Sequence, residues 1–361
     1  MGKPKRNSYA SKSGRAGRSG RSRARERGRQ AGADAKRREE AARRDRDRAK
    51  LLARYEDVEP DGRILCMYGS HADTEWTDGQ IRMCLLAPKV HKLFGLCVGD
   101  RVWTERGATE EERVIVARAP RVTEIRRRRS EEDRTGHVIA ANVDRMAITA
   151  SLREPPLRTG ALDRYLVLAS VLNVEPLLVI TKIDQAHQED PGWVTLEPYR
   201  ALGIPVIATS AESGHGLEEL RELLRGSVTV FAGHSGVGKS SLCLALGILD
   251  APEAGELSYA HGRVRGRHTT SVARLLELPG GGGWVVDTPG VRAIGLVDLR
   301  PEDARVHFTE FADFAGDCEF ASCLHVAEED CGVRAAVDKG KVPVARYEGY
   351  LRLMTTLEEG L

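Results

Sequence analysis

Hydrophobic positions divide the chain into regions with different patterns. Between residue 62 and about residue 120, short apolar runs alternate with glycine-containing turns, which is typical of the strands of a small barrel. We therefore expect an OB-fold over residues 58–120, with an SH3-like barrel as the alternative. The runs lie at residues 63–67, 81–86, 100–103 and 113–117.

Beyond residue 140, apolar runs alternate with segments of helical character. This alternation predicts an α/β domain over residues 121–298, with a parallel sheet covered on both faces. Residues 299–361 differ again, with a Cys/His cluster and a helix expected at residues 344–357. The predicted strands lie at residues 145–150, 176–180, 204–208, 228–232 and 284–286, and the predicted helices at residues 161–171, 217–224 and 241–249.

The first 50 residues are rich in positive charge and have almost no large apolar side chains. They hold 19 Lys and Arg against 6 Asp and Glu, whereas the rest of the chain holds 36 against 47. Because such a segment buries too little surface to offset its ordering entropy, we expect a disordered basic arm over residues 1–50. Residues 36–54 also have the composition of a charged helix. The charge favours RNA phosphates as partner, and a solvated or targeting-like tail is the alternative.

A second basic run, residues 126–129, is either an RNA contact or a solvated linker between the two domains. No run reaches about 18 apolar residues, so no membrane-spanning helix is predicted. The N-terminal charges are not followed by an apolar stretch, which excludes a secretory signal. The seven cysteines are odd in number and suit a reducing compartment, so we expect a cytoplasmic protein without a membrane partner.

A phosphate-binding loop follows the apolar run at residues 228–232. The segment from Gly233 to Ser240 fits the pattern G-x-x-x-x-G-K-[S/T]. Backbone N–H groups of such a loop and the next helix bind phosphate oxygens. Lys239 is expected to reach the β- and γ-phosphates, and the Ser240 hydroxyl to bind Mg²⁺. The expected nucleotide-binding residues are Gly233, His234, Ser235, Gly236, Val237, Gly238, Lys239, Ser240 and Ser241.

Asp287, at the end of the last predicted strand, opens a second phosphate-related motif, D-T-P-G. Asp287 is expected to hold Mg²⁺ through a water molecule, and the Gly290 N–H to sense the γ-phosphate. Between the two motifs, Thr269 and Thr270 are candidates for a further Mg²⁺ ligand in a segment that responds to the γ-phosphate. We favour Thr270.

A guanine-recognition segment, Thr181-Lys182-Ile183-Asp184, follows the apolar run at residues 176–180. The Asp184 carboxylate can accept two hydrogen bonds from guanine, and adenine lacks that pair of donors. Lys182 can cover the base. Asn is usual at the first position of this pattern, so Thr181 offers one hydroxyl where an amide is expected.

Behind the next predicted strand, Ser210 and Ala211 are expected to offer a backbone N–H to the guanine oxygen. In an ordinary GTPase the guanine-recognition segments follow the phosphate loop. Here they precede it, so the order of the motifs is rotated.

A metal-binding pattern lies near the C-terminus. Cys318, Cys323, His325 and Cys331 supply three thiolates and one imidazole within a short segment. Four such ligands leave no open position, which is typical of a structural Zn²⁺ site. Free thiols beside a surface histidine are the alternative.

Together these motifs resemble the circularly permuted GTPases, and in particular the ribosome small subunit-dependent GTPase A (RsgA/YjeQ) family. The likeness covers about residues 60–355 and includes residues 141–144, residues 162–166 and the spelling of the phosphate loop. It implies an OB-fold, a permuted GTPase domain and a C-terminal zinc domain. It also implies binding to the small ribosomal subunit and its rRNA late in maturation, with hydrolysis of GTP to GDP stimulated by that subunit. We expect the OB-fold, the zinc domain and the basic arm to bind rRNA, and we expect a monomer.

The group that positions the attacking water is left open. Val291 stands where Ras-like enzymes have a glutamine. His268 is the nearest candidate, and a switch-segment histidine without a catalytic role is the alternative. Two other functions remain: an RNA-binding checkpoint protein that uses GTP only as a structural ligand, and a P-loop kinase. The guanine-recognition segment argues against the kinase.

Overall fold

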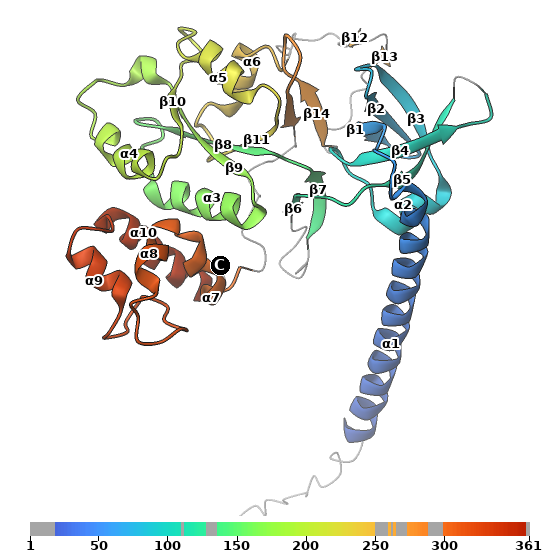
Figure 1. Ribbon diagram of the computed structural model, residues 1–361, viewed down its shortest axis with the longest axis horizontal. Helices are drawn as coiled ribbons and strands as arrows, with labels where there is room; N and C mark the ends of the chain where they lie inside the picture. Colours follow the sequence, from blue (N-terminus) through green and yellow to red (C-terminus); the bar gives the residue numbers. More distant parts are fainter. Residues whose placement is uncertain are drawn as a thin grey trace, which may run out of the picture. The chain divides into compact units, whose positions relative to one another are not determined.

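The computed structural model describes residues 19–109, 112–127, 136–249, 259–260, 263–264, 273–287 and 299–358, with residues 19–34, 37, 259–260 and 263–264 described by their backbone alone (Figure 1). The chain forms two compact units, Met1–Val58 and Glu59–Leu361. Among the described helices, none combines the length and the apolar character that a bilayer crossing requires.

The first unit contains one long helix, α1 (Ser19–Leu52), followed by a short 3₁₀ turn, η1 (Ala53–Tyr55). The expectation of a disordered arm is therefore wrong for residues 19–50. Ala, Arg, Glu and Gln have high helix propensity, and pairs such as Arg43 with Asp47 one turn apart support the helix. These local features favour a helix although the segment has almost no apolar side chains. Residues 1–18 lie outside the described part of the chain.

The second unit begins with a five-stranded barrel. Strands follow the order β1-β2-β3-β5-β4, and β1 also pairs with β4, which closes the barrel. All pairs are antiparallel except β3 with β5. This closed order, with α2 between β3 and β4, is that of an OB-fold and confirms the first expectation. The elements are β1 (Gly62–Tyr68), β2 (His71–Trp76), β3 (Ile81–Leu86), α2 (Pro88–Phe94), β4 (Arg101–Arg106) and β5 (Arg113–Arg118).

The α/β domain has five parallel strands in the order β10-β9-β8-β11-β15. Helices α3 and α4 cover one face, where Leu162 and Leu196 join the core, and α5 and α6 cover the other, where Leu220 and Leu242 do so. The strands are β8 (Arg145–Ser151), β9 (Glu175–Thr181), β10 (Val206–Ala208), β11 (Val228–Ala232) and β15 (Trp284–Asp287); the helices are α3 (Thr159–Leu172), η2 (Ile183–Gln185), α4 (Gly192–Ala201), α5 (Leu217–Leu224) and α6 (Lys239–Ala245).

One strand that the sequence pattern did not predict joins the barrel to this sheet. β14 (Arg274–Glu277) runs antiparallel to β15 and also pairs with β1, where Cys66 lies opposite Arg274. The result is a continuous sheet of eleven strands. Two short hairpins stand apart from it, β6 (Glu124–Arg127) with β7 (His137–Ala141), and β12 (Tyr259–Ala260) with β13 (Arg263–Val264). The basic run at residues 126–129 thus begins inside a strand, and its last two residues lie outside the described chain.

The C-terminal part is helical and packs on α3. Its core is built from Phe308, Phe311 and Tyr350, and Val167 of α3 belongs to the same cluster. Helices α10 and α3 lie side by side (Figure 1). The elements are α7 (Pro301–Ala304), η4 (Arg305–His307), η5 (Thr309–Phe311), α8 (Ala312–Ala315), α9 (Gly332–Asp338) and α10 (Val344–Glu358).

Candidate nucleotide site and metal centre

The predicted nucleotide motifs meet at one edge of the parallel sheet. The segment of residues 181–184 follows β9, residues 209–211 follow β10, the phosphate loop follows β11 and Asp287 ends β15. Because these strands are parallel neighbours, their carboxyl ends lie along the same edge, where open α/β sheets bind ligands. The rotated order of the motifs therefore leaves their arrangement in space intact.

The phosphate loop is held close to β8. Gly233 has a φ of +144°, and a Cβ there would lie 2.2 Å from the Thr149 carbonyl oxygen, so only glycine fits. The Lys239 ammonium donates hydrogen bonds of 2.7 Å to the carbonyl oxygens of Gly233 and His234. The lysine side chain thus folds back over its own loop.

A cavity of about 440 Å³ joins the phosphate loop to the ends of the flanking strands. Lys182 and Asp287 line it together with Lys239, Ser240 and other loop residues. The Ser240 hydroxyl and the Asp287 carboxylate are hard oxygen donors in one cavity, a donor set that suits Mg²⁺. Asp287 also pairs with Arg274 of β14 at 3.7 Å. The predicted Thr270 and Gly290, and with them Thr269, His268 and Val291, lie outside the described residues.

Thr181 has a role that the sequence pattern did not indicate. Its side chain is 4% exposed, and its hydroxyl lies 2.5 Å from the carbonyl oxygen of Val237 and 3.1 Å from that of Ala150. The hydroxyl therefore ties the guanine-recognition segment to the phosphate loop and to β8. Lys182 has a positive φ of 56°, and its ammonium donates to the Glu154 carbonyl at 2.8 Å.

Asp184 and Ser210 form a second contact between the two recognition segments. The Ser210 hydroxyl donates to the Asp184 carboxylate at 2.6 Å and accepts the N–H groups of Glu212 and Ser213. The Ser210 N–H donates to the His215 carbonyl. Ser210 thus orients the aspartate with its side chain, and Ala211 is the better candidate for the backbone donor to guanine.

A smaller cavity of about 210 Å³ lies on the other side of the phosphate loop, against the start of α3. The exposed His234 and Ser235 of the loop line it with Arg158 and Tyr165. On the nucleotide side, burial raises the pKa of the Cys243 thiol to about 12, so this cysteine stays protonated and unreactive.

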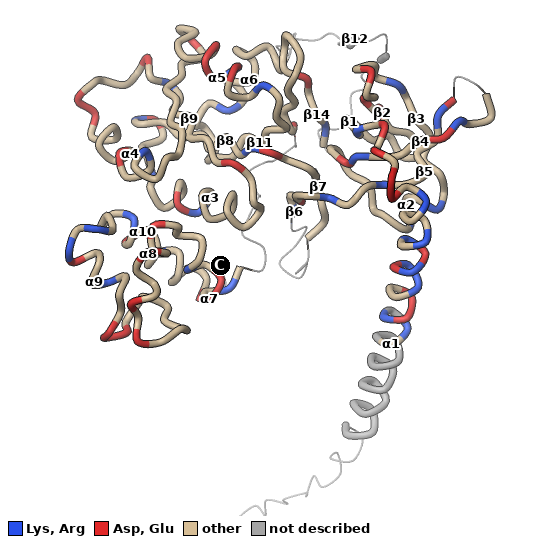
Figure 2. Tube along the Cα trace, viewed as in Figure 1, with Lys and Arg blue, Asp and Glu red and all other residues tan. Residues whose placement is uncertain are grey.

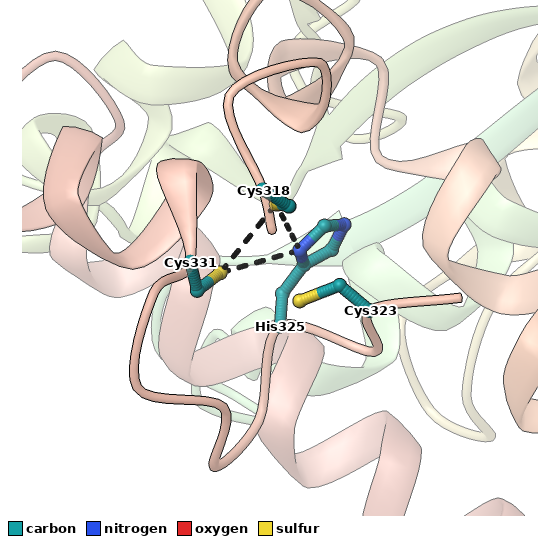
Figure 3. Close-up of side chains that lie close together, drawn as sticks. All are labelled: Cys318, Cys323, His325 and Cys331. Carbon is teal, nitrogen blue, oxygen red and sulfur yellow. Dashed lines mark hydrogen bonds between the residues drawn. The ribbon is translucent and has the colours of Figure 1, made fainter. Parts of the chain in front are cut away.

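The four predicted metal ligands converge in the C-terminal part (Figure 3). Their ligand atoms all lie within 4.8 Å of one another. The His325 Nδ1 atom is 3.5 Å from the Cys318 sulfur and 3.3 Å from the Cys331 sulfur, and these two sulfurs are 3.9 Å apart. Tetrahedral Zn²⁺ with Zn–S bonds of about 2.3 Å separates its sulfurs by roughly 3.8 Å. The geometry fits one zinc ion, with Cys323 as the fourth ligand.

Hydrogen bonds fix the backbone around this cluster. The Tyr347 hydroxyl donates to the His325 carbonyl at 2.7 Å, and the Tyr350 hydroxyl donates to the Leu324 carbonyl. His325 itself is 3% exposed with a φ of +59°. Burial lowers the pKa of His325, which favours the neutral imidazole that binds a metal.

The fold and the site define a circularly permuted P-loop GTPase. The sequence model of the family described as RsgA GTPase matches residues 118–297. The small ribosomal subunit biogenesis GTPase RsgA of Chlorobaculum parvum is 41% identical over 275 residues, which cover 73% of this chain and 86% of that protein. The chain belongs to the RsgA GTPase family.

Solved structures agree with this assignment. The crystal structure of YjeQ from Thermotoga maritima superimposes with a TM-score of 0.67 at 32% identity, covering 83% of this chain and 99% of that one. The structure of YloQ, described as a circularly permuted GTPase, gives a TM-score of 0.66 at 26% identity, covering 84% and 97%.

Proposed function

We propose that this protein is a GTPase that acts in the biogenesis of the small ribosomal subunit, late in its maturation. The observation that supports it most is the meeting of a phosphate loop and a guanine-recognition segment at one sheet edge, in a chain that also carries an OB-fold. Similarity to a protein named small ribosomal subunit biogenesis GTPase RsgA supports the subunit as partner.

In this proposal each part of the site has one task. The loop N–H groups and Lys239 bind the β- and γ-phosphates, and Asp184, oriented by Ser210, selects guanine over adenine. Ser240 and Asp287 hold Mg²⁺, with Thr270 and Gly290 completing the γ-phosphate side. The metal neutralises charge on the phosphate oxygens when bound. The products are GDP and phosphate.

The subunit completes the hydrolytic site in this proposal. Val291 has no group that can orient a water molecule, so hydrolysis by the free protein is slow. We further propose that the protein works as a cytoplasmic monomer and that the basic arm and the barrel contact rRNA. The net positive charge of residues 1–50 supports this role of the arm.

The test is GTP turnover by the purified, zinc-loaded protein with and without small subunits. We expect strong stimulation by the subunits, and loss of turnover by at least about 100-fold in Lys239→Ala, since the phosphates lose their main protein cation. Lys92→Ala, an exposed lysine of the barrel, is the matched control for intrinsic turnover.

Two outcomes would replace the proposal. Binding of GTP without stimulated turnover would favour the RNA-binding checkpoint, and preference for ATP in a titration would favour a kinase. For the arm, deletion of residues 1–50 is expected to flatten the salt dependence of subunit binding. An unchanged slope would exclude the arm as an RNA contact.

A further inference from the structure

The loop that carries the metal ligands presents a second set of side chains to the solvent. Cys318, Cys323, His325 and Cys331 turn toward one another (Figure 3), and most of the residues between them are exposed. Phe320 is 57% exposed. An exposed aromatic ring costs free energy in water and is a common anchor in protein interfaces. We define the zinc-loop surface as Asp317, Glu319, Phe320, Val326, Glu329 and Asp330.

This surface is strongly acidic. Residues 306–333 contain seven Asp and Glu and no Lys or Arg. Two of the seven have partners within the fold. Glu310 forms an ion pair with Arg346, and Glu328 accepts backbone N–H groups of its own loop. The other five are exposed and make no ion pair within the described part of the chain; they are Asp313, Asp317, Glu319, Glu329 and Asp330. Figure 2 shows acidic positions gathered in the loops below α9, with basic positions around α9 itself.

The two arginines that flank the loop do not neutralise it through ion pairs. Arg305 donates to the carbonyl oxygens of Ala321 and Cys323, and Arg334 donates to that of Glu328. Both guanidinium groups therefore hold the loop by its backbone. Zinc does not reverse the charge either, because three thiolates outnumber the two charges of one Zn²⁺.

A surface of this sign does not fit RNA. Contacts to a nucleic acid depend on cationic side chains that replace the ions around its phosphates. Unpaired carboxylates repel these phosphates. The same carboxylates attract cationic protein segments, with Phe320 and Val326 available for apolar side chains of the partner. The chain thus combines a basic arm, suited to RNA, with a surface of the opposite charge.

We propose that the zinc-loop surface binds a cationic, apolar-containing segment of a protein and not RNA. The identity of this partner rests on the proposed function: it is a basic segment of a small-subunit protein. The basic arm then binds RNA, and the zinc-loop surface binds protein, on the same particle.

Neutralising carboxylates of the zinc-loop surface changes the affinity for the subunit in opposite directions for a protein partner and for RNA. The test variant is Glu319→Gln with Asp330→Asn, two exposed carboxyls whose residues are joined by a backbone hydrogen bond of 3.0 Å. Full-length, zinc-loaded protein is titrated with small subunits in the presence of a non-hydrolysable GTP analogue. A cationic protein partner predicts binding about three- to ten-fold weaker than wild type. An RNA partner predicts tighter binding, because two repulsive charges are gone.

The matched control is Glu189→Gln with Glu219→Gln, two exposed carboxyls of the GTPase domain that make no ion pair among the described residues. It is expected to bind like wild type. Unchanged zinc content and unfolding temperature show that both variants fold. Equal affinity of the test variant and wild type would overturn the inference while leaving the proposed function in place. If the wild-type protein does not bind small subunits, the proposed function itself is wrong.

A cross-link identifies the partner directly. A photoreactive phenylalanine analogue at position 320 is activated on the subunit complex, and the product is digested with nuclease or protease. We expect a cross-link to a basic small-subunit protein. The same probe at Val306, which is 66% exposed in the same part of the fold but outside the loop, is the control. A cross-link from position 320 to RNA alone, or none, would overturn the inference.

Discussion

Arg346 of α10 forms an ion pair with Asp163 of α3, although 183 positions separate them in the chain. Arg346 is 3% exposed and pairs with Glu310 at 2.6 Å as well. Its guanidinium lies over the rings of Tyr199 and Phe308, and the Tyr199 hydroxyl donates to Asp163 at 2.8 Å. This buried network joins the zinc-binding part to the helix whose start lines the smaller cavity beside the phosphate loop.

Replacing Arg346 by alanine is expected to destabilise the protein strongly. Two carboxylates would remain buried without their cation, a situation that costs about 3–5 kcal/mol. Denaturant unfolding followed by tryptophan and far-UV signals measures the loss. The control is Arg352→Ala, an exposed residue of the same helix that pairs with Glu348 at 3.7 Å, with an expected cost below about 1 kcal/mol. Equal effects of the two substitutions would show that the network adds little.

Thr181→Val is expected to weaken GTP binding without unfolding the domain. The valine keeps the shape of the side chain but leaves the Val237 and Ala150 carbonyls without the hydroxyl donor, at a cost of about 1–3 kcal/mol. With half of this cost falling on the loop that binds phosphate, the expected loss of affinity is roughly two- to ten-fold. Thr181→Ser and Thr181→Asn keep a donor and are expected to bind GTP at least nearly as well as wild type. A fluorescence titration with a labelled nucleotide distinguishes them.

Glu328→Gln is expected to speed zinc release. Glu328 accepts the N–H groups of Leu324, Val326 and Ala327 at 2.6–3.0 Å, which fixes the backbone next to His325. Losing the charge at this partly exposed site costs about 1 kcal/mol, or about a five-fold faster release to a chelator. Glu329→Gln, the exposed neighbour, is the control and is expected to release zinc at the wild-type rate.

The same residue predicts a pH dependence. Burial raises the pKa of Glu328, but hydrogen bonds from backbone N–H groups outweigh it and lower the pKa from 4.5 to about 2. A lowered carboxyl pKa stabilises the fold fully above pH 4.5, and this contribution is lost as the pH falls toward 2. Stability of Glu328→Gln measured across this range should therefore fall less steeply than that of wild type. Parallel curves would contradict the assignment.

One zinc ion per chain is expected by elemental analysis, and Cys331→Ala should lose it. Because the C-terminal part has a small core, loss of the metal should also make it sensitive to protease. Cys97→Ala, a buried thiol of the barrel, should keep its zinc. Full zinc content in Cys331→Ala would refute the ligand set.

The elements that the sequence predicts are those in which consecutive residues are buried alike. Strands β9 and β11 are buried on both faces, so they are visible as continuous apolar runs. β2 and β14 were missed because their sequences, HADTEW and RLLE, are short or polar, and only pairing with β1 and β15 makes them strands. The helix from Ser19 was missed in part because low hydrophobicity was taken to mean disorder, whereas helix propensity needs no core.

The candidate site divides in the same way. The phosphate loop, the guanine-recognition segment and the metal-ligand pattern follow from residue types at fixed spacing, since each is formed within one short segment of chain. Three contacts between distant segments do not follow from such spacing. They are the hydrogen bond from the Thr181 hydroxyl to the phosphate loop, the hydrogen bond from the Ser210 side chain to Asp184, and the ion pair of Arg346 with Asp163. The sequence by itself determined the motifs, their rotated order and the charge of each region. Only the tertiary structure decided which distant residues meet, because those contacts depend on the order of strands in the sheet and on what the packing leaves buried.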